Sequence, residues 1–249
     1  MLNLAARAGV RYSMENPYVY IQANATGNLD LLEEARLQGA GEFVLASTSS
    51  LNSGQAMLFW ESLPVASRIS PSATTENAAE SIACTYHHLC GIDVSVAMCF
   101  AVYGPAGRSG MSYLRFIHAI ETGTPVVVCG DGERSRDFTF VDDIARGGAV
   151  LAAKRLGYGI VNLGGGIRPF SIGHVVRSLE VMLGKSAVVD CQGAHVADMK
   201  STWANATNAK ALLGWEPTVG LEEGLQRCVD WYRGNRSWLQ KLPGVCGAV

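Results

Sequence analysis

Short runs of apolar, often β-branched residues alternate along the chain with longer stretches whose apolar residues recur at helical spacing. The short runs predict buried strands, and the longer stretches predict amphipathic helices. Strands are expected at 43–46, 92–98, 126–128, 138–141, 160–163 and 187–190, and at the start of the segment 1–9. Helices are expected at 24–38, 73–89, 111–121, 209–213 and 221–232. This alternation favours a parallel sheet with helices on both of its faces.

Polar residues and glycines predict where several of these helices begin and end. Gly39 is expected to end the helix over 24–38. Asp142 and Ser171 are expected to cap two further helices, which run to Lys154 and Leu183. The segment 51–69 is expected to be a loop.

The composition excludes several classes of partner. Apolar residues make up 48% of the 249 residues and charged residues 17%, which is typical of a globular domain. A net charge of −2 gives no basic surface for nucleic acid. No apolar run reaches the roughly 18–20 residues that a membrane span requires, and the first residues lack the layout of a signal peptide. We therefore expect a cytoplasmic protein without nucleic-acid or membrane partners.

The seven cysteines are scattered along the chain, and none forms a C-x-x-C pair. This spacing indicates neither a metal site nor a disulfide framework. We expect buried, reduced thiols, because free cysteine is among the most buried residue types.

Several motifs occur together in the order and spacing of one known family. They are NLAARAGVRYS at 3–13, Asn24 with Gly27, ASTSS at 46–50, FAVYGP at 100–105, GDG at 130–132, RDFTFVDD at 136–143, NLGGG at 162–166, LLGWEPT at 212–218 and LEEG at 221–224. With these motifs the chain resembles the extended short-chain dehydrogenase/reductases, the NAD-dependent epimerase/dehydratases that act on nucleotide sugars. The resemblance covers residues 2 to about 233, and AGVRYS is most similar to the UDP-glucuronate 4-epimerase branch.

The resemblance implies an α/β fold, an incomplete Rossmann-like parallel sheet with a small α/β substrate domain. Residues 1–105 and 138–165 would form the nucleotide-binding part, and residues 106–137 and 166–249 the substrate domain. The family's ligands are NAD and a UDP-sugar.

The resemblance also implies roles for two residues of the substrate site. Thr48 matches the residue that bonds the sugar hydroxyl undergoing oxidation, and its place at a strand end supports this role. Alternatively, Thr48 only caps the following turn. Arg136 matches the arginine that binds the UDP diphosphate. Alternatively, it forms an ion pair with a carboxylate such as Asp137.

Further ligand contacts follow from the same resemblance. His195, which precedes Asp198, stands where the family has a second diphosphate-binding arginine, so these two residues join Arg136 as candidate substrate-binding residues. The chain's candidate cofactor-binding residues are Ala5, Ala6 and Asn24. No metal ligands are implied.

The family's catalytic pair is absent from its matching positions. The family has a Tyr that acts as a phenolate and, four residues later, a Lys that lowers its pKa. Ser72 and Glu76 stand there in this chain. A serine hydroxyl forms no oxyanion near neutral pH, and a carboxylate would disfavour one. Glu76 is expected to be a solvated residue at a helix start, unless burial raises its pKa and allows acid/base work.

A glycine-rich phosphate loop is also missing from the matching region. The family opens with a strand and a G-x-x-G-x-x-G turn, whereas this chain begins near the family's fourth strand. Gly164, Gly165 and Gly166 lack the spacing of such a loop. We therefore expect an N-terminally truncated relative with weakened NAD binding.

Three hypotheses remain open. The chain is an NAD-dependent nucleotide-sugar 4-epimerase, or a non-catalytic protein that binds a nucleotide sugar or a partner, or a truncated gene product. The helices over 25–38 and 73–89 match the family's dimer interface, so a homodimer, or a heterodimer with a homologue, is expected.

Overall fold

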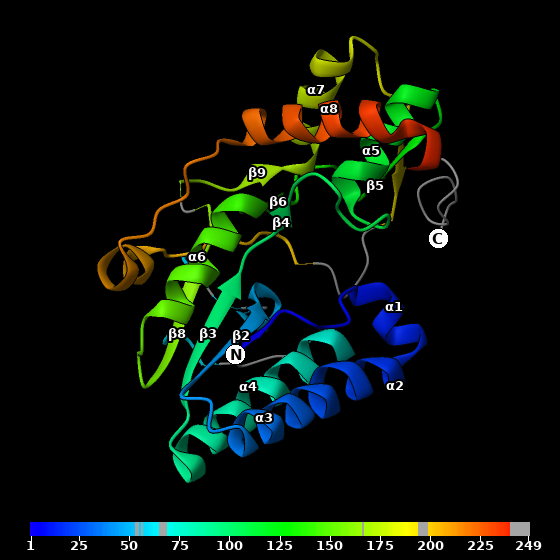
Figure 1. Cartoon of the computed structure of the whole chain (residues 1–249). Helices are drawn as coiled ribbons and strands as arrows, with labels where there is room; N and C mark the ends of the chain where they lie inside the picture. The colour runs from blue at the N-terminus through cyan, green and yellow to red at the C-terminus, as the bar shows by residue number, and fades with distance from the viewer. Residues whose placement is uncertain (53–54, 56, 65–68, 166, 194–198, 240–249) are drawn as a thin grey trace.

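The computed structural model describes residues 1–52, 55, 57–64, 69–165, 167–193 and 199–239. Its main sheet has four parallel strands in the order β1-β2-β3-β8 (Figure 1). These strands are β1 (Leu2–Asn3), β2 (Glu42–Thr48), β3 (Asp93–Cys99) and β8 (Tyr158–Leu163). The α/β fold with a parallel sheet, predicted from the alternating pattern, is confirmed.

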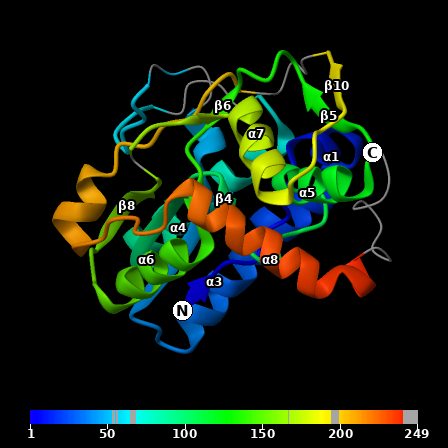
Figure 2. The same cartoon turned by 90° about the horizontal axis from the view of Figure 1, so that it is seen from above.

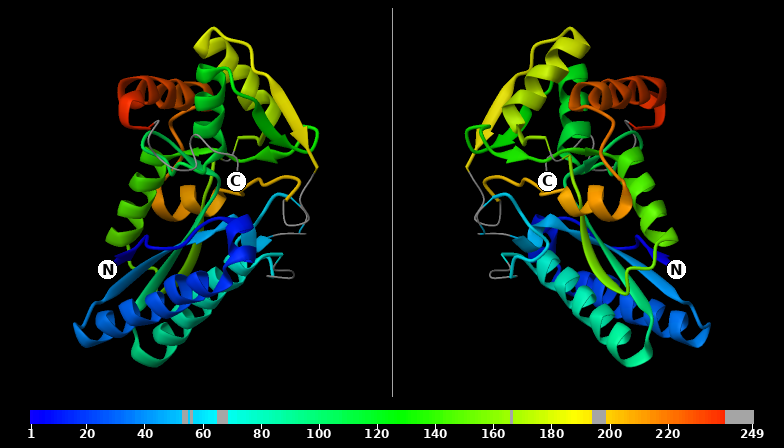
Figure 3. Two further views of the ribbon diagram at one scale, coloured as in Figure 1. Left: turned by 90° about the vertical axis from the view of Figure 1, so that its right-hand side faces the viewer. Right: turned by 90° about the vertical axis from the view of Figure 1, so that its left-hand side faces the viewer.

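Helices cover both faces of this sheet (Figures 1 and 3). On one face, Phe43 and Leu45 of β2 pack against α3 (Gly27–Leu37) and α4 (Pro71–Cys90). On the other face, Val44 packs against α6 (Val141–Ala153) and the π-helical turn Ala209–Leu213. Successive side chains of a strand point to opposite faces. The unbroken apolar run of β2 is therefore explained by burial on both sides.

The predicted helix over 24–38 begins earlier in the structure. A continuous helical stretch runs from α2 (Pro17–Tyr20) through a π-helical turn, Ile21–Thr26, into α3, and the short helix α1 (Val10–Glu15) precedes it. Tyr18 and Ile21 are exposed within this stretch. The apolar residues therefore do not mark one buried face, which is why their pattern did not predict a helix.

A second group of elements contains the two-stranded parallel sheet of β5 (Val126–Cys129) and β10 (Val189–Gln192). The helices α5 (Ser112–Thr122), α7 (Ile172–Leu183) and α8 (Leu221–Leu239) pack against one another, and α5 also contacts β5 (Figures 1 and 2). Short strand pairs join this group to the main sheet: β4 (Val102–Tyr103) with β7 (Thr139–Phe140), and β6 (Ser135–Arg136) with β9 (Phe170–Ser171). A 3-10 turn, Ser49–Asn52, follows β2. The domain boundaries stay a prediction.

The predicted caps are confirmed in one case and wrong in the other. The Ser171 hydroxyl accepts a hydrogen bond from the His174 N–H at 3.1 Å, as expected of an N-cap. Asp142 does not cap α6, because that helix begins at Val141 and its N-cap residue is Phe140. Strand β7 leads directly into the helix, so Asp142 falls inside the first turn.

The cysteines differ from the expectation of burial. Cys228 is buried, Cys99 and Cys129 are half-buried, and Cys84, Cys90 and Cys191 are exposed. All six are free thiols. Helix α4 carries two of the exposed thiols on its solvent side, where size and hydrophobicity do not decide the position of so small a side chain. Cys246 lies outside the described residues.

Gly224 is required for the close packing of α8. A Cβ atom at this position would lie 2.6 Å from Cζ of Tyr103 and 2.8 Å from Cδ2 of Phe140. Gly224→Ala is therefore expected to lower the free energy of unfolding by about 1–3 kcal/mol, the usual effect of overpacking. Gly234 lies in the same helix with no atom within 4 Å of such a Cβ, so Gly234→Ala should be neutral or slightly stabilising. Urea unfolding of both variants checks this prediction, and equal stability of the two would contradict it.

Candidate functional site

The carboxyl ends of β2 and β3 meet the first turns of α4. Thr48 ends β2 beside Cys99 at the end of β3. Ser70 caps α4 through a 3.2 Å hydrogen bond that its hydroxyl accepts from the Ala73 N–H, and Pro71 occupies the first helical turn. Ligands of open parallel sheets bind at this end of the strands. The sequence-predicted residues Thr48, Ser72 and Glu76 are therefore brought to one end of the sheet.

Ser72 and Glu76 lie one helical turn apart and face each other. The Ser72 hydroxyl donates a hydrogen bond to Oε1 of Glu76 at 3.4 Å, and Ser72 is buried. Burial raises the pKa of Glu76 to about 7; the Ser72 hydrogen bond opposes the increase, and the charge of Glu80 adds to it. The expectation that Glu76 is solvated is therefore wrong. Its side chain is half-buried, because α4 turns this position toward the sheet.

Glu80, one turn further along α4, is a buried carboxyl group. Burial raises its pKa, and the nearby Ser47 hydroxyl partly opposes this effect, although no hydrogen bond joins the two side chains by geometry. Two neighbouring carboxyl groups inside the fold favour the protonated form of at least one of them.

The Thr48 hydroxyl is engaged with the turn that follows β2. It accepts a hydrogen bond from the Ser50 N–H and donates one to the Ser50 hydroxyl, each at 3.2 Å. These contacts are those of the turn-capping alternative. The role of Thr48 toward a sugar stays a prediction.

Two of the candidate cofactor residues, Asn24 and Ala5, make hydrogen bonds within the protein in or beside the loop 4–9. The side chain of Asn24 is buried, accepts a hydrogen bond from the Arg7 N–H at 2.6 Å and donates to Thr75 Oγ1 at 3.0 Å. The Ala5 N–H donates to Oδ1 of Asn3 at 3.0 Å, and Ala5 and Ala6 are exposed. Asn24 therefore holds this loop against α4, and its role toward a cofactor stays untested.

Tyr20 is a buried residue of this region that the sequence did not indicate. Its hydroxyl donates to the Gly9 carbonyl oxygen at 2.8 Å. Burial raises its pKa, although Arg108 and Arg7 act in the opposite direction. Glu76 is close enough to raise it further. The raised pKa disfavours a phenolate at Tyr20.

The glycines after β8 form no open phosphate cradle. A Cβ atom on Gly165 would lie 2.6 Å from Oδ1 of Asp137 and 2.7 Å from the Phe138 carbonyl oxygen, and one on Gly164 would lie 2.9 Å from Oδ2 of Asp137. The close approach that these glycines permit is used by the protein's own chain.

Arg136 lies on β6, at the edge of the second group of elements. Its Nη1 donates to the Ser135 carbonyl oxygen at 2.7 Å. Asp137, its proposed ion-pair partner, is buried and accepts a hydrogen bond from the Ala204 N–H at 2.8 Å. His195 and Asp198 lie outside the described residues.

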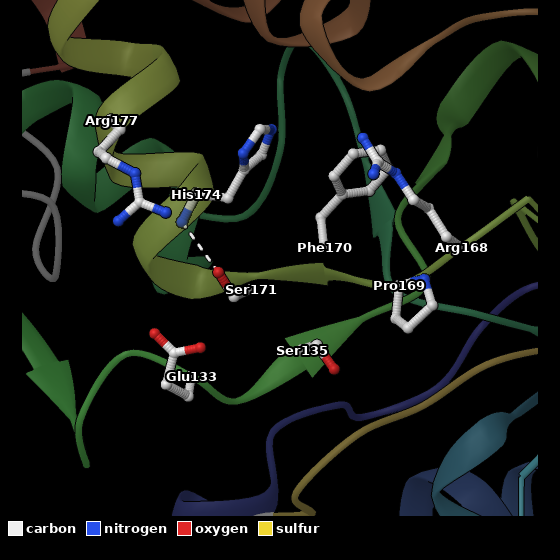
Figure 4. A pocket seen from close by; sticks show the side chains of 8 residues that line it. All are labelled: Glu133, Ser135, Arg168, Pro169, Phe170, Ser171, His174 and Arg177. Atoms are coloured by element: carbon white, nitrogen blue, oxygen red, sulfur yellow. Dashed lines mark hydrogen bonds between the residues drawn. The ribbon is translucent and has the colours of Figure 1, made fainter.

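A cavity of about 360 Å³ opens beside β6 (Figure 4). It is lined by Glu133, Ser135, Arg168, Pro169, Phe170, Ser171, His174 and Arg177. The Arg168 guanidinium lies 5.0 Å from the centre of the Phe170 ring, and the His174 ring stacks on that ring at 5.2 Å. The N-terminus of α7 faces the same space, and it favours negative charge. Two guanidinium groups against the single carboxylate of Glu133 make the charged lining cationic on balance, so the cavity suits a planar or anionic group. The sequence missed it because its residues come from separate motifs.

Within the described part of the chain, no group of three or more His, Cys, Asp or Glu residues is arranged to hold a metal ion. The described helices also include none with the length and apolar character needed to cross a membrane.

Comparisons with known proteins show the family of this chain. The model of the NAD dependent epimerase/dehydratase family matches residues 1–164. A UDP-glucuronate 4-epimerase of Thermodesulfobacterium geofontis is 50% identical over 242 residues, which cover 97% of this chain and 75% of that protein. The chain belongs to this family.

Solved structures of family members resemble the whole fold. MoeE5 in complex with UDP-glucose and NAD superimposes with a TM-score of 0.90 at 32% identity, over 94% of this chain and 79% of that one. The UDP-glucuronic acid 4-epimerase of Bacillus cereus, in complex with UDP-glucuronic acid and NAD, gives 0.89 at 31% identity, over 93% and 74%. The Rossmann-like fold expected from the resemblance is thereby confirmed. The family is NAD-dependent by its description.

Proposed function

We propose that this protein is a nucleotide-sugar-binding relative of the UDP-glucuronate 4-epimerases that does not carry out their oxidation and reduction at C4. The observation that carries the proposal is the Ser72–Glu76 pair. The Ser72 hydroxyl donates its proton toward a carboxyl group with a pKa of about 7. A neighbouring carboxylate raises the pKa of a hydroxyl, which is the opposite of what a family lysine does.

Retention of a nucleotide sugar is supported by the cationic and aromatic lining of the second group of elements. Arg168 and Arg177 flank the cavity of Figure 4, with the Phe170 ring between Arg168 and His174. Guanidinium groups bind phosphate oxygens through paired hydrogen bonds. Arg136, on the adjacent strand, fits the same ligand chemistry. The relatives named above bind or act on UDP-sugars, which supports the UDP-glucuronate class.

An acidic sugar is further supported near the loop 4–9. The Nη1 atom of Arg108 donates to the Ala8 carbonyl oxygen at 3.0 Å. Arg108 and Arg7 both act on the pKa of Tyr20, so two guanidinium groups lie close to the carboxyl end of the main sheet. A uronate carboxylate is the sugar substituent that such groups would favour.

Association of two chains, predicted for the helices over 25–38 and 73–89, belongs to the same proposal. Leu37 on α3 and Leu89 on α4 are 67% and 73% exposed. Burial of exposed leucines of this kind favours association. A homodimer or a heterodimer with a homologue fits this surface.

Calorimetric titration tests the proposal. UDP-glucuronate is expected to bind, and NMR of the mixture with NAD is expected to find no conversion to its 4-epimer. Arg136→Ala should weaken UDP-glucuronate binding about tenfold, the effect of one lost charge-assisted contact of about 1.4 kcal/mol. Arg155→Ala, at an exposed position, is the matched control and should bind as the wild type does.

Two outcomes would contradict it. Formation of the 4-epimer would favour the active-epimerase hypothesis. Failure of UDP-glucuronate to bind would contradict the retention of a nucleotide-sugar site.

A further inference from the structure

The cavity of Figure 4 contains three charged groups that have no partner within the described part of the chain. The guanidinium groups of Arg168 and Arg177 and the carboxylate of Glu133 all line it. The described residues form no ion pair with any of the three and no hydrogen bond to their charged ends. Arg168 instead lies over the ring of Phe170, 5.0 Å from its centre. The cavity therefore presents unused hydrogen-bond donors and an unused acceptor to the same space.

The backbone brings Glu133 and Arg177 to the same side of this cavity. Gly132, which precedes Glu133, accepts a hydrogen bond at its carbonyl oxygen from the Gly173 N–H at 2.9 Å. A Cβ atom on Gly173 would lie 3.4 Å from Nη1 of Arg177, so this guanidinium lies over the first turn of α7. Figure 4 shows Glu133 and Arg177 on one side of the cavity and Arg168 on the other. An acceptor and a donor are thereby grouped, and a second cation lies across the space from them.

We propose that this cavity binds the nucleotide end of a uridine diphosphate sugar, with the base edge on Glu133 and Arg177 and the phosphate groups on Arg168. This inference rests on the proposed function, because it needs a nucleotide sugar that binds. The imide edge of uracil carries one N–H donor between two carbonyl oxygens. An ionised carboxylate only accepts hydrogen bonds, and a guanidinium only donates them. Glu133 therefore suits the imide N–H, and Arg177 suits a neighbouring carbonyl oxygen of the base.

The size and the lining of the cavity fit the rest of the nucleotide. Its volume of about 360 Å³ lies within the roughly 300–1,000 Å³ of small-molecule sites. Arg168 offers the paired, charge-assisted donors that phosphate oxygens favour. A simple anion such as inorganic phosphate would give Glu133 no base donor and would be repelled by its charge. The carboxylate therefore distinguishes a nucleotide from a bare anion, and this determines the sign of its effect on binding.

Calorimetric titration with UDP, and with UDP methylated at N3 of the uracil, tests the role of Glu133. The two probes carry the same charge and differ in the imide N–H. The wild type should bind UDP about fivefold more tightly than the methylated probe, because the methylated base cannot donate to Glu133. Glu133→Ala should bind the two probes equally, and its affinity for UDP should fall about fivefold. Glu34→Ala, at an exposed position on α3, is the matched control and should keep the preference for UDP.

Arg168→Ala should weaken the binding of both probes by the same factor, about tenfold, since it removes a phosphate contact and not a base contact. Glu133 and Arg168 are exposed, so both variants should fold. Equal affinities of the wild type for the two probes, or tighter binding of UDP by Glu133→Ala, would overturn the assignment of the base to this cavity. Unchanged binding of both probes by Arg168→Ala would overturn the assignment of the phosphates. Each of these results leaves the proposed function intact when UDP-glucuronate binds to the wild type. Absence of that binding would overturn the proposed function and this inference with it.

Discussion

Asp143→Ala is expected to lower the free energy of unfolding by about 3 kcal/mol, because the carboxylate of Asp143 fixes the chain that leads into α8. Its Oδ2 accepts hydrogen bonds from the Thr218 and Val219 N–H groups at 2.9 and 3.0 Å. Its Oδ1 accepts from the Thr218 hydroxyl at 2.8 Å and from Arg146 Nη2 at 2.6 Å. The magnitude follows from leaving these donors without an acceptor; the contribution of Arg146, whose side chain is 42% exposed, is reduced by solvent.

The direction of the pKa shift of Asp143 also indicates that these contacts stabilise its carboxylate. Burial acts to raise it, but the hydrogen bonds from Val219, Arg146 and Thr218 outweigh burial and hold the pKa below its ordinary value. The ionised carboxylate is therefore more stable in the folded chain than in the unfolded one.

Guanidinium chloride unfolding at pH 7 measures the change. Asp142→Ala is the matched control, because the neighbouring Asp142 side chain is 70% exposed and contacts only Arg227, at 3.5 Å, among the ion pairs of the described chain. It should change stability by less than about 0.5 kcal/mol. If Asp142 capped α6, its loss would cost about 1 kcal/mol, so a larger effect at Asp142 than at Asp143 would contradict both statements.

The main sheet was predictable from the sequence because its strands are buried on both faces. β2, β3 and β8 are apolar runs bounded by polar residues, and each was located to within two residues at either end. The pairs β4–β7 and β6–β9 have two residues per strand, too few for any periodicity. Their existence depends on contacts between segments that are distant in sequence.

The candidate site was predictable only where a motif fixed a position relative to a strand or helix. Thr48 and Ser72 stand at the element ends expected for them. The burial of Glu76 could not be predicted, since a polar residue in the first turns of a helix is ordinarily exposed and only the packing of α4 on the sheet decides otherwise. The cavity of Figure 4 is lined by residues of two segments, 133–135 and 168–177. These segments are distant in sequence, and no local pattern predicts that they meet.

Stability itself is expected to fall by as much as roughly 3 kcal/mol as the pH rises from 5 to 8, because Glu76 must lose a proton inside the fold. Its pKa is about 7 in the folded chain and 4.5 as an ordinary glutamate. The folded state therefore binds more protons than the unfolded state between these two values, and stability is lost as the pH rises through them. Glu80, whose pKa is raised in the same direction, adds to this slope.

Glu76→Gln distinguishes the contribution of Glu76 to this pH dependence of stability from the contribution of Glu80. The amide cannot ionise, so the variant should match the wild type near pH 5 and exceed its stability at pH 8, keeping only the smaller slope due to Glu80. Glu76→Lys should be stabilising at pH 8 as well, because an ammonium group one turn from Glu80 would compensate a buried carboxylate. Denaturant unfolding at pH 5, 6.5 and 8 measures all three proteins. A wild type whose stability is unchanged across this range would mean that Glu76 is ionised at little cost, and the acidic end of α4 would then be open to solvent after all.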